Sequence, residues 1–155
     1  MSLTECQLEL KKLLLMELTM TNTTITNQNP ELTKIHINQL LDQLIVDYQN
    51  TKSDRKAISA EFSISEAEFT VLEEIELLTT DIRGYANQIK VIGYLENVQE
   101  KIRILQKMRV FDIPIIAQLY FHTPGKYENF KSYLRMLDYL RLLILEYLNL
   151  SQAIS

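Results

Sequence analysis

The chain has 155 residues and a net charge of −4, and 46% of its residues are hydrophobic and 23% charged, which is ordinary for one globular domain. Its three Gly and three Pro are too few for the tight turns of a many-stranded sheet, and its one cysteine, Cys6, excludes an intrachain disulfide or a thiolate metal cluster. The negative charge does not favour a nucleic acid or an anionic membrane surface as a partner.

The N-terminal stretch predicts a first helix over 3–20, because Leu3, Cys6 and Leu10 fall on one side of such a helix. The segment that follows, 21–29, has no charge and a single apolar residue, and its Asn and Thr side chains favour loops. We therefore expect a single helical domain over 1–155, in which a polar linker over 21–29 joins the first helix to the rest.

A second helix is predicted over 29–62. Asn29 is a favoured helix cap and Pro30 a favoured first helical residue. Apolar residues from Ile37 to Phe62 then recur in alternating steps of four and three. The middle of this stripe is polar, so we expect the helix to fray or bend over 49–55.

A long helical stretch is predicted over 65–109, where Ser65 and Glu68 have the spacing of a capping box. Apolar residues keep heptad spacing until the phase slips by one residue beside Gly93, and a kink or short break is expected there. The residues over 79–84 form a competing break signal, but the apolar spacing keeps its phase across them and favours a continuous helix.

The length of this stretch bears on the shape of the molecule. An unbroken helix over 65–109 would be about 67 Å long, whereas a compact domain of this size has a diameter of roughly 40 Å. Either the helix breaks or the molecule is elongated. Elongated helical hairpins commonly cover their exposed seam by forming a dimer.

The C-terminal third predicts a short helix over 111–121, with Asp112 as its cap and Pro114 in its first turn, and then a last helix that opens at Lys126. Over 134–150 this last helix carries two apolar stripes that merge. Merging stripes are typical of a helix surrounded by others, so the last helix is expected to be central. The predicted fold is all-α, a bundle of about five helices built on a long antiparallel hairpin of 29–62 and 65–105, with the last helix across it.

Motifs that carry chemistry are missing from the sequence. Neither His36 nor His122 has a Glu three residues before it, and the His-Glu-x-x-His zinc motif does not occur. The chain also has no Gly-x-Ser-x-Gly, no phosphate-binding loop and no glycine-rich dinucleotide turn. We therefore expect a protein that is not an enzyme, with no catalytic residue, cofactor or metal.

The charge layout points to a candidate surface. The range 61–81 holds seven acids and no base, and 101–109 holds four bases and no acid. The helix dipole is enough to explain acids near a helix start and bases near its end, but two copies aligned antiparallel would also pair acidic with basic halves. Aromatic residues with a polar tip are common at interfaces, in pocket walls and in helical cores. The candidate interaction residues are Lys101, Arg103, Lys107, Arg109, Glu66, Glu73, Glu76, Tyr133 and Tyr147.

These features favour a non-enzymatic protein–protein interaction module, such as an adaptor, an assembly subunit or a regulator, that binds a protein partner or forms a homodimer. One alternative is a helical nucleic-acid-associated regulator that uses the four bases over 101–109. A second is a small-ligand-binding protein or enzyme with a Tyr/Met-lined pocket near the last helix. No secretory signal and no apolar run near the roughly 20 residues of a membrane span is visible, so a cytoplasmic location is expected.

Overall fold

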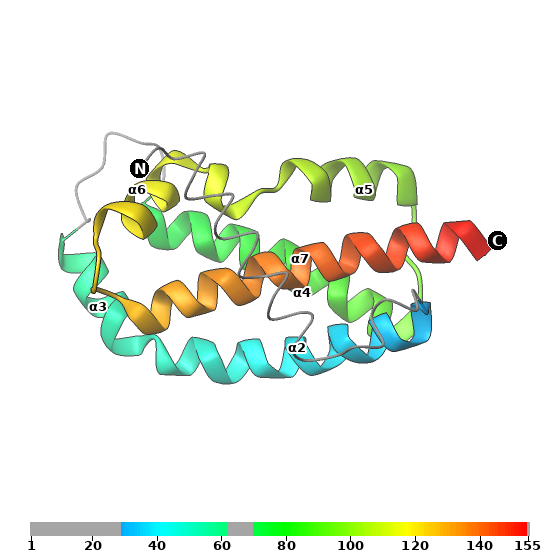
Figure 1. The fold of residues 1–155 in the computed structure, drawn as a ribbon, viewed down its shortest axis with the longest axis horizontal. Coiled ribbons are helices and arrows are strands. Elements are labelled where there is room, and N and C mark those ends of the chain that lie inside the picture. Colours follow the sequence, from blue (N-terminus) through cyan, green and yellow to red (C-terminus); the bar gives the residue numbers. More distant parts are fainter. Residues whose placement is uncertain (1–28, 62–69, 155) are drawn as a thin grey trace.

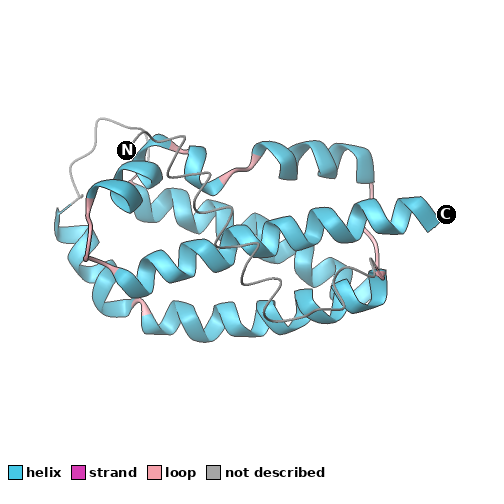
Figure 2. Cartoon of the chain, in the orientation of Figure 1, coloured by secondary structure: helices cyan, strands magenta, loops and turns pink. Residues whose placement is uncertain are grey.

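The computed structural model describes residues 29–61 and 70–154, and every regular element within them is helical (Figure 2). The prediction of an all-α fold is therefore confirmed, while the first helix predicted over 3–20 and all of the linker before Asn29 lie outside the described residues. In chain order the elements are α2 (Pro30–Asn50), α3 (Lys52–Glu61), α4 (Val71–Ile92), α5 (Val98–Lys107), the 3-10 turn η2 (Val110–Asp112), α6 (Pro114–His122) and α7 (Glu128–Ile154).

The long helices run lengthwise and alternate in direction (Figure 1). From α2 and α3 the chain turns back along α4, returns along α5, and finishes along α7, so α4 and α7 point the same way. The short helices α3 and α6 lie at the end where α7 begins. α7 contacts α2, α3, α4, α5 and η2, which confirms the prediction that the last helix is central.

The pairing of the helices differs from the predicted hairpin. α2 makes its most extensive contact with α7 and a smaller one with α4. α7 also lies lengthwise beside α2 rather than across it (Figure 1). The pair α2–α4 is therefore antiparallel, as expected, but it is not the main unit of the fold.

The core position of α7 follows from its sequence. Its apolar residues bury on several sides at once, which is the pattern expected for a helix enclosed by neighbours. Full burial of one leucine contributes roughly 1.5–3 kcal/mol, so α7 carries much of the stability of the bundle. Its buried apolar residues are Phe130, Tyr133, Leu134, Leu137, Tyr139, Leu140, Leu143, Ile144, Tyr147 and Leu148.

The break between α2 and α3 lies inside the range predicted to fray or bend. α2 starts as predicted, with the Asn29 side chain accepting a hydrogen bond from the Glu31 N–H at 2.9 Å. Its last residue is Asn50, and the residue after it, Thr51, is fully buried and donates from Oγ1 to the Tyr48 carbonyl at 2.6 Å. The hydroxyl thus takes a backbone acceptor at the helix end, and a new helix begins at the next residue.

The start of α4 is encoded locally, at a position that sequence reasoning missed. Thr70 Oγ1 accepts from the Glu73 N–H at 3.2 Å, and the Glu73 carboxylate accepts from the Thr70 N–H at 3.3 Å. This reciprocal pair is a capping box. The predicted box of Ser65 and Glu68 lies outside the described residues.

The end of α4 confirms one prediction and corrects another: a kink or short break was expected at Gly93, but the chain reverses its direction between α4 and α5, so 65–105 is not one arm of a hairpin (Figure 1). The helix is continuous across 79–84, and it stops at Gly93, whose φ of 82° is in the left-handed region that glycine adopts without strain. The apolar stripe drifts along the helix: Ala86 is fully buried in place of the predicted Tyr85, and Ile92 is 49% exposed. A straight helix has 3.6 residues per turn, so a strict heptad reading loses its phase after several turns.

The start of α6 corrects a predicted cap. Ile113, not Asp112, occupies the cap position of α6, and no side chain bonds to the backbone there. Asp112 instead ends the turn η2, where its carboxylate lies 3.4 Å from the Arg109 guanidinium. The preceding 3-10 turn shifts the helix start by one residue beyond the cap read from the sequence.

The N-terminus of α7 is capped from another helix. Tyr127 precedes the helix with a φ of 57°, and the first N–H groups of a helix need acceptors from outside its own backbone ladder. Asp54 of α3 supplies one, because its Oδ2 accepts from the Phe130 N–H at 3.0 Å. The Tyr127 hydroxyl also donates to Glu61 at the end of α3. These contacts attach α3 to the start of α7.

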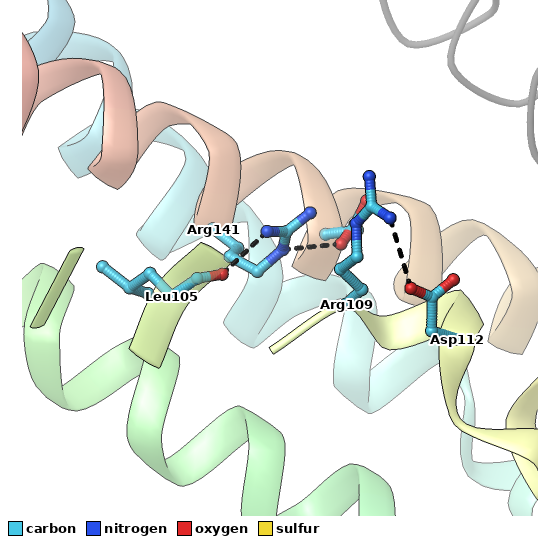
Figure 3. Close-up of polar contacts among 5 residues, drawn as sticks. Leu105, Arg109, Asp112 and Arg141 are labelled. Atoms are coloured by element: carbon cyan, nitrogen blue, oxygen red, sulfur yellow. Dashed lines mark hydrogen bonds and ion pairs between the residues drawn. The ribbon is translucent and has the colours of Figure 1, made fainter. Parts of the chain in front are cut away.

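Arg141 of α7 makes a buried ion pair within its own helix and a hydrogen bond to α5. Arg141 Nε donates to Asp138 Oδ1 at 2.9 Å, and Arg141 Nη1 donates to the Leu105 carbonyl at 2.8 Å (Figure 3). Leu105 lies in the last turn of α5, where carbonyl groups have no partner within the helix. None of the helices in the described part of the chain combines the length and the apolar character needed to cross a membrane.

Candidate functional site

The four predicted basic residues fall on α5 and directly after it. Ile102 and Leu105 bury one face of α5, which leaves Arg103, Lys107 and Arg109 exposed. Lys101 is half-buried, and its ammonium lies 5.7 Å from the centre of the Tyr85 ring. We call Lys101, Arg103, Lys107 and Arg109 the basic face.

The predicted acids lie on the outer face of α4. Glu73, Glu76 and Asp81 are exposed and surround Leu77, which is itself 51% exposed. Together with Thr80 they line a shallow hollow of about 280 Å³. We call Glu73, Glu76, Leu77, Thr80 and Asp81 the acidic face. The third predicted acid, Glu66, lies outside the described residues.

The two faces are not neutralised within the described ranges 29–61 and 70–154. The ion pairs there are Arg109–Asp112, Lys126–Glu61 and Arg141–Asp138. No acid of the acidic face and, apart from Arg109, no base of the basic face belongs to them. Apart from Arg109, these charges therefore have no ion-pair partner among the described residues.

The two tyrosines predicted as contact residues belong to the core. Tyr133 is 1% exposed and its hydroxyl lies 3.0 Å from Thr79 Oγ1. Tyr147 is 5% exposed and its hydroxyl donates to the Gly93 carbonyl at 2.6 Å. Both rings face inward because they lie on the merged stripes of α7, so neither residue presents a contact surface.

A cavity that sequence reasoning missed lies between α2, α3, α4 and α7, with a volume of about 370 Å³. Its polar lining residues are Tyr48, Arg55, Glu76, Thr79, Thr80 and Arg83, and its apolar ones are Leu72, Ile75 and Phe130. We call this cavity the arginine pocket, because it brings together guanidinium groups from α3 and α4.

Arg55 is held in place by two nearby residues, Thr51 and Tyr48. Its Nε donates to Thr51 Oγ1 at 2.9 Å and its Nη1 donates to the Tyr48 hydroxyl at 3.1 Å. Its guanidinium carbon also lies 4.0 Å from the centre of the Tyr48 ring, a cation–π contact. The Tyr48 ring in turn packs against the Tyr133 ring, with centroids 5.5 Å apart.

Arg83 has no such partner. Its Nε is buried, and within the described part of the chain it has no hydrogen bond or ion pair. The pKa of Tyr133 is raised, because burial outweighs its hydrogen bond with Thr79 and the charges of Arg83 and Arg55, which lower it. Both guanidinium groups are therefore close enough to act on the same buried phenol.

A second, more open hollow of about 260 Å³ lies between α2 and α7 and includes Met136 and Tyr139. It is the nearest counterpart of the Tyr/Met-lined pocket predicted near the last helix. Its other lining residues include His36 and Leu143 but no acid.

Neither a metal site among the described residues nor a similarity to known proteins points to a function. Over 29–61 and 70–154 no three His, Cys, Asp or Glu side chains are placed to hold a metal ion together. Comparison of the chain with protein-family models, with curated proteins and with solved structures gives no match.

Proposed function

We propose that the protein is a non-enzymatic interaction module that contacts other proteins through the acidic face of α4 and the basic face of α5. The supporting observation is that both faces are exposed while their charges stay unpaired within the described residues, apart from Arg109. An exposed leucine, Leu77, at the centre of the acidic face adds an apolar anchor within a polar rim. That combination is typical of protein interfaces.

The partner we propose is a second copy of the chain. In a two-fold symmetric dimer each surface patch is used twice, so the acidic face of each copy can meet the basic face of the other. Complementary faces of this kind set the orientation and the rate of association, whereas like charges brought together cost several kcal/mol. A homodimer therefore satisfies both faces with one contact geometry.

Charge reversal tests this proposal. Glu76→Lys with Asp81→Lys makes the acidic face basic, and Arg103→Glu with Lys107→Glu makes the basic face acidic. Each double variant alone should weaken self-association by about tenfold or more, because like charges then meet in the dimer. An equimolar mixture of the two should restore a dimer, because the reversed faces complement each other. Sedimentation equilibrium measures both effects.

Matched controls carry the same change in net charge at exposed positions outside the two faces. Asp42→Lys with Glu96→Lys controls for the first variant, and Lys52→Glu with Lys56→Glu for the second. Neither control should change the association constant. A strictly monomeric wild-type chain at high concentration and low salt would contradict the homodimer. If the two charge-reversal variants do not form a dimer when mixed, the pairing of the acidic face with the basic face is contradicted.

The nucleic-acid alternative rests on the same basic face. Four bases gathered on one short helix and the residues after it could contact phosphates, and such contacts give a steep fall of affinity with salt. We expect no such salt dependence in a filter-binding titration, because the acidic face would repel the same backbone. A steep slope that Arg103→Glu with Lys107→Glu abolishes would favour this alternative instead.

A further inference from the structure

We infer that the arginine pocket is a binding site for a small organic oxyanion, meaning a phosphate monoester or a carboxylate joined to an apolar group. The site is separate from the two charged faces except for Glu76 and Thr80, which line both.

The pocket has an excess of positive charge. Two guanidinium groups, Arg55 and Arg83, line it against one carboxylate, Glu76, which is exposed. Neither arginine has an ion pair in the described part of the chain. Arginine presents several donors in a planar fork that suits phosphate and carboxylate oxygens.

The helix sequences explain why these arginines are unpaired. An ion pair on one helix needs an acid three or four residues away. The residues at these distances from Arg83 are Thr79, Thr80, Ala86 and Asn87, none of them acidic. Arg55 likewise has Thr51 and Ser59 four residues away and Lys52 and Ile58 three residues away.

Arg83 has a buried donor, Nε–H, without a hydrogen-bond acceptor in the described structure. A buried donor without an acceptor costs about 1–3 kcal/mol, and buried polar groups are nearly always satisfied. Its Nε is buried without an acceptor in the described structure, and the pocket is where its guanidinium lies. Thr79 and Thr80 add hydroxyl groups beside it, although each already makes a hydrogen bond. An oxyanion in the pocket would give the guanidinium group the charged partner that it lacks among the described residues.

The pocket is larger than the oxyanion alone requires. Its volume of about 370 Å³ falls at the low end of the range of roughly 300–1,000 Å³ for ligand sites. Leu72, Ile75 and Phe130 form an apolar part of its lining. A ligand with an aromatic or branched apolar group would therefore fill the pocket better than inorganic phosphate.

Calorimetric titration with four probes tests the inference: phenyl phosphate, benzoate, inorganic phosphate and the neutral molecule benzamide. We expect one of the two aromatic anions to bind more tightly than inorganic phosphate, and benzamide not to bind. Binding of phenyl phosphate or of benzoate assigns the oxyanion class. Arg83→Met should weaken that binding about ten- to a hundredfold, because it removes charged hydrogen bonds and keeps the apolar stem.

Two controls separate a binding role from a structural one. Arg103→Met removes an exposed arginine of α5 and should leave the affinity unchanged. Arg83→Met should not lower the unfolding temperature without ligand, since the substitution breaks no ion pair of the described residues and removes a buried donor that has no acceptor. The Nε–H signal of Arg83 in a nitrogen NMR spectrum should shift on titration. Equal affinity of Arg83→Met and wild type, equal binding of benzamide, or no binding of any anion would overturn the inference.

Discussion

Arg141 provides the strongest test of how the bundle is held together. Its guanidinium pairs with Asp138 at 2.9 Å, and the two side chains are only 6% and 10% exposed. A second guanidinium nitrogen donates to the Leu105 carbonyl at 2.8 Å, which links α7 to the last turn of α5 (Figure 3). We predict that Arg141→Ala destabilises the protein more than any substitution at an exposed ion pair.

The magnitude follows from what the substitution leaves behind. Asp138 would remain buried as an uncompensated carboxylate, and breaking a buried pair from one side costs about 3–5 kcal/mol. The Leu105 carbonyl would lose its side-chain donor as well. Domains of this size have a total stability of about 5–15 kcal/mol, so much of it would be lost. At about 2–4 °C per kcal/mol, the unfolding temperature should fall by roughly 6–20 °C.

Urea denaturation followed by circular dichroism measures the change in the free energy of unfolding. Arg109→Ala is the matched control, because Arg109 and Asp112 are 3.4 Å apart but 50% and 44% exposed. Exposed pairs contribute about 0–1 kcal/mol, so the control should change little. Arg141→Met combined with Asp138→Leu removes both charges and should cost less than Arg141→Ala alone. Equal losses for Arg141→Ala and Arg109→Ala would refute the reasoning.

Three further predictions concern the helix ends. Asp54→Ala should lower the free energy of unfolding in urea by about 1–2 kcal/mol, because Asp54 accepts the Phe130 N–H in the first turn of α7; no change would show that water replaces the cap. Burial, together with the hydrogen bond to Glu61, raises the pKa of Tyr127 to about 12. The free energy of unfolding that this shift adds is therefore fully present below pH 10, and it falls by about 1.4 kcal/mol per pH unit between pH 10 and pH 12. Tyr127→Phe should flatten the stability curve in that interval, and an unchanged slope would contradict the assignment. Gly93→Ala should lower thermal stability by about 1 kcal/mol because its φ is 82°, and a neutral result would mean that the chain relaxes there.

The parts of the fold that local chemistry determines could be predicted. Pro30 opens α2 and Gly93 closes α4 because each residue fits only a few backbone conformations at those places. Two merging apolar stripes predicted that the last helix would be enclosed, and α7 is. These signals act within a few residues of one another, so no knowledge of the neighbouring helices is needed to read them.

Other local signals were ambiguous or overridden. The spacing of Thr70 and Glu73 is the same as that of Ser65 and Glu68, and nothing in the sequence says which pair starts the helix. Asp112 is of a residue type favoured at helix caps, but the turn η2 places it one residue before the cap position of α6. The cap of α7 comes from α3, 76 residues earlier in the chain, and spacing rules cannot reach across that separation.

The arginine pocket could not be predicted from the sequence, because it depends on how helices distant in the chain pack together. Arg141 has an acid three residues before it, and the two pair in the core. Arg83 has no acid three or four residues away on either side, so no side chain of its own helix is spaced to pair with it. The sequence therefore identifies Arg83 as a cation whose ion-pair partner must come from another helix or from a ligand. Only the packing of α3 against α4 shows that the neighbour is another guanidinium, Arg55, rather than a carboxylate. Two like charges at one pocket are unfavourable unless an anion joins them, and this is the physical reason for placing an oxyanion between them.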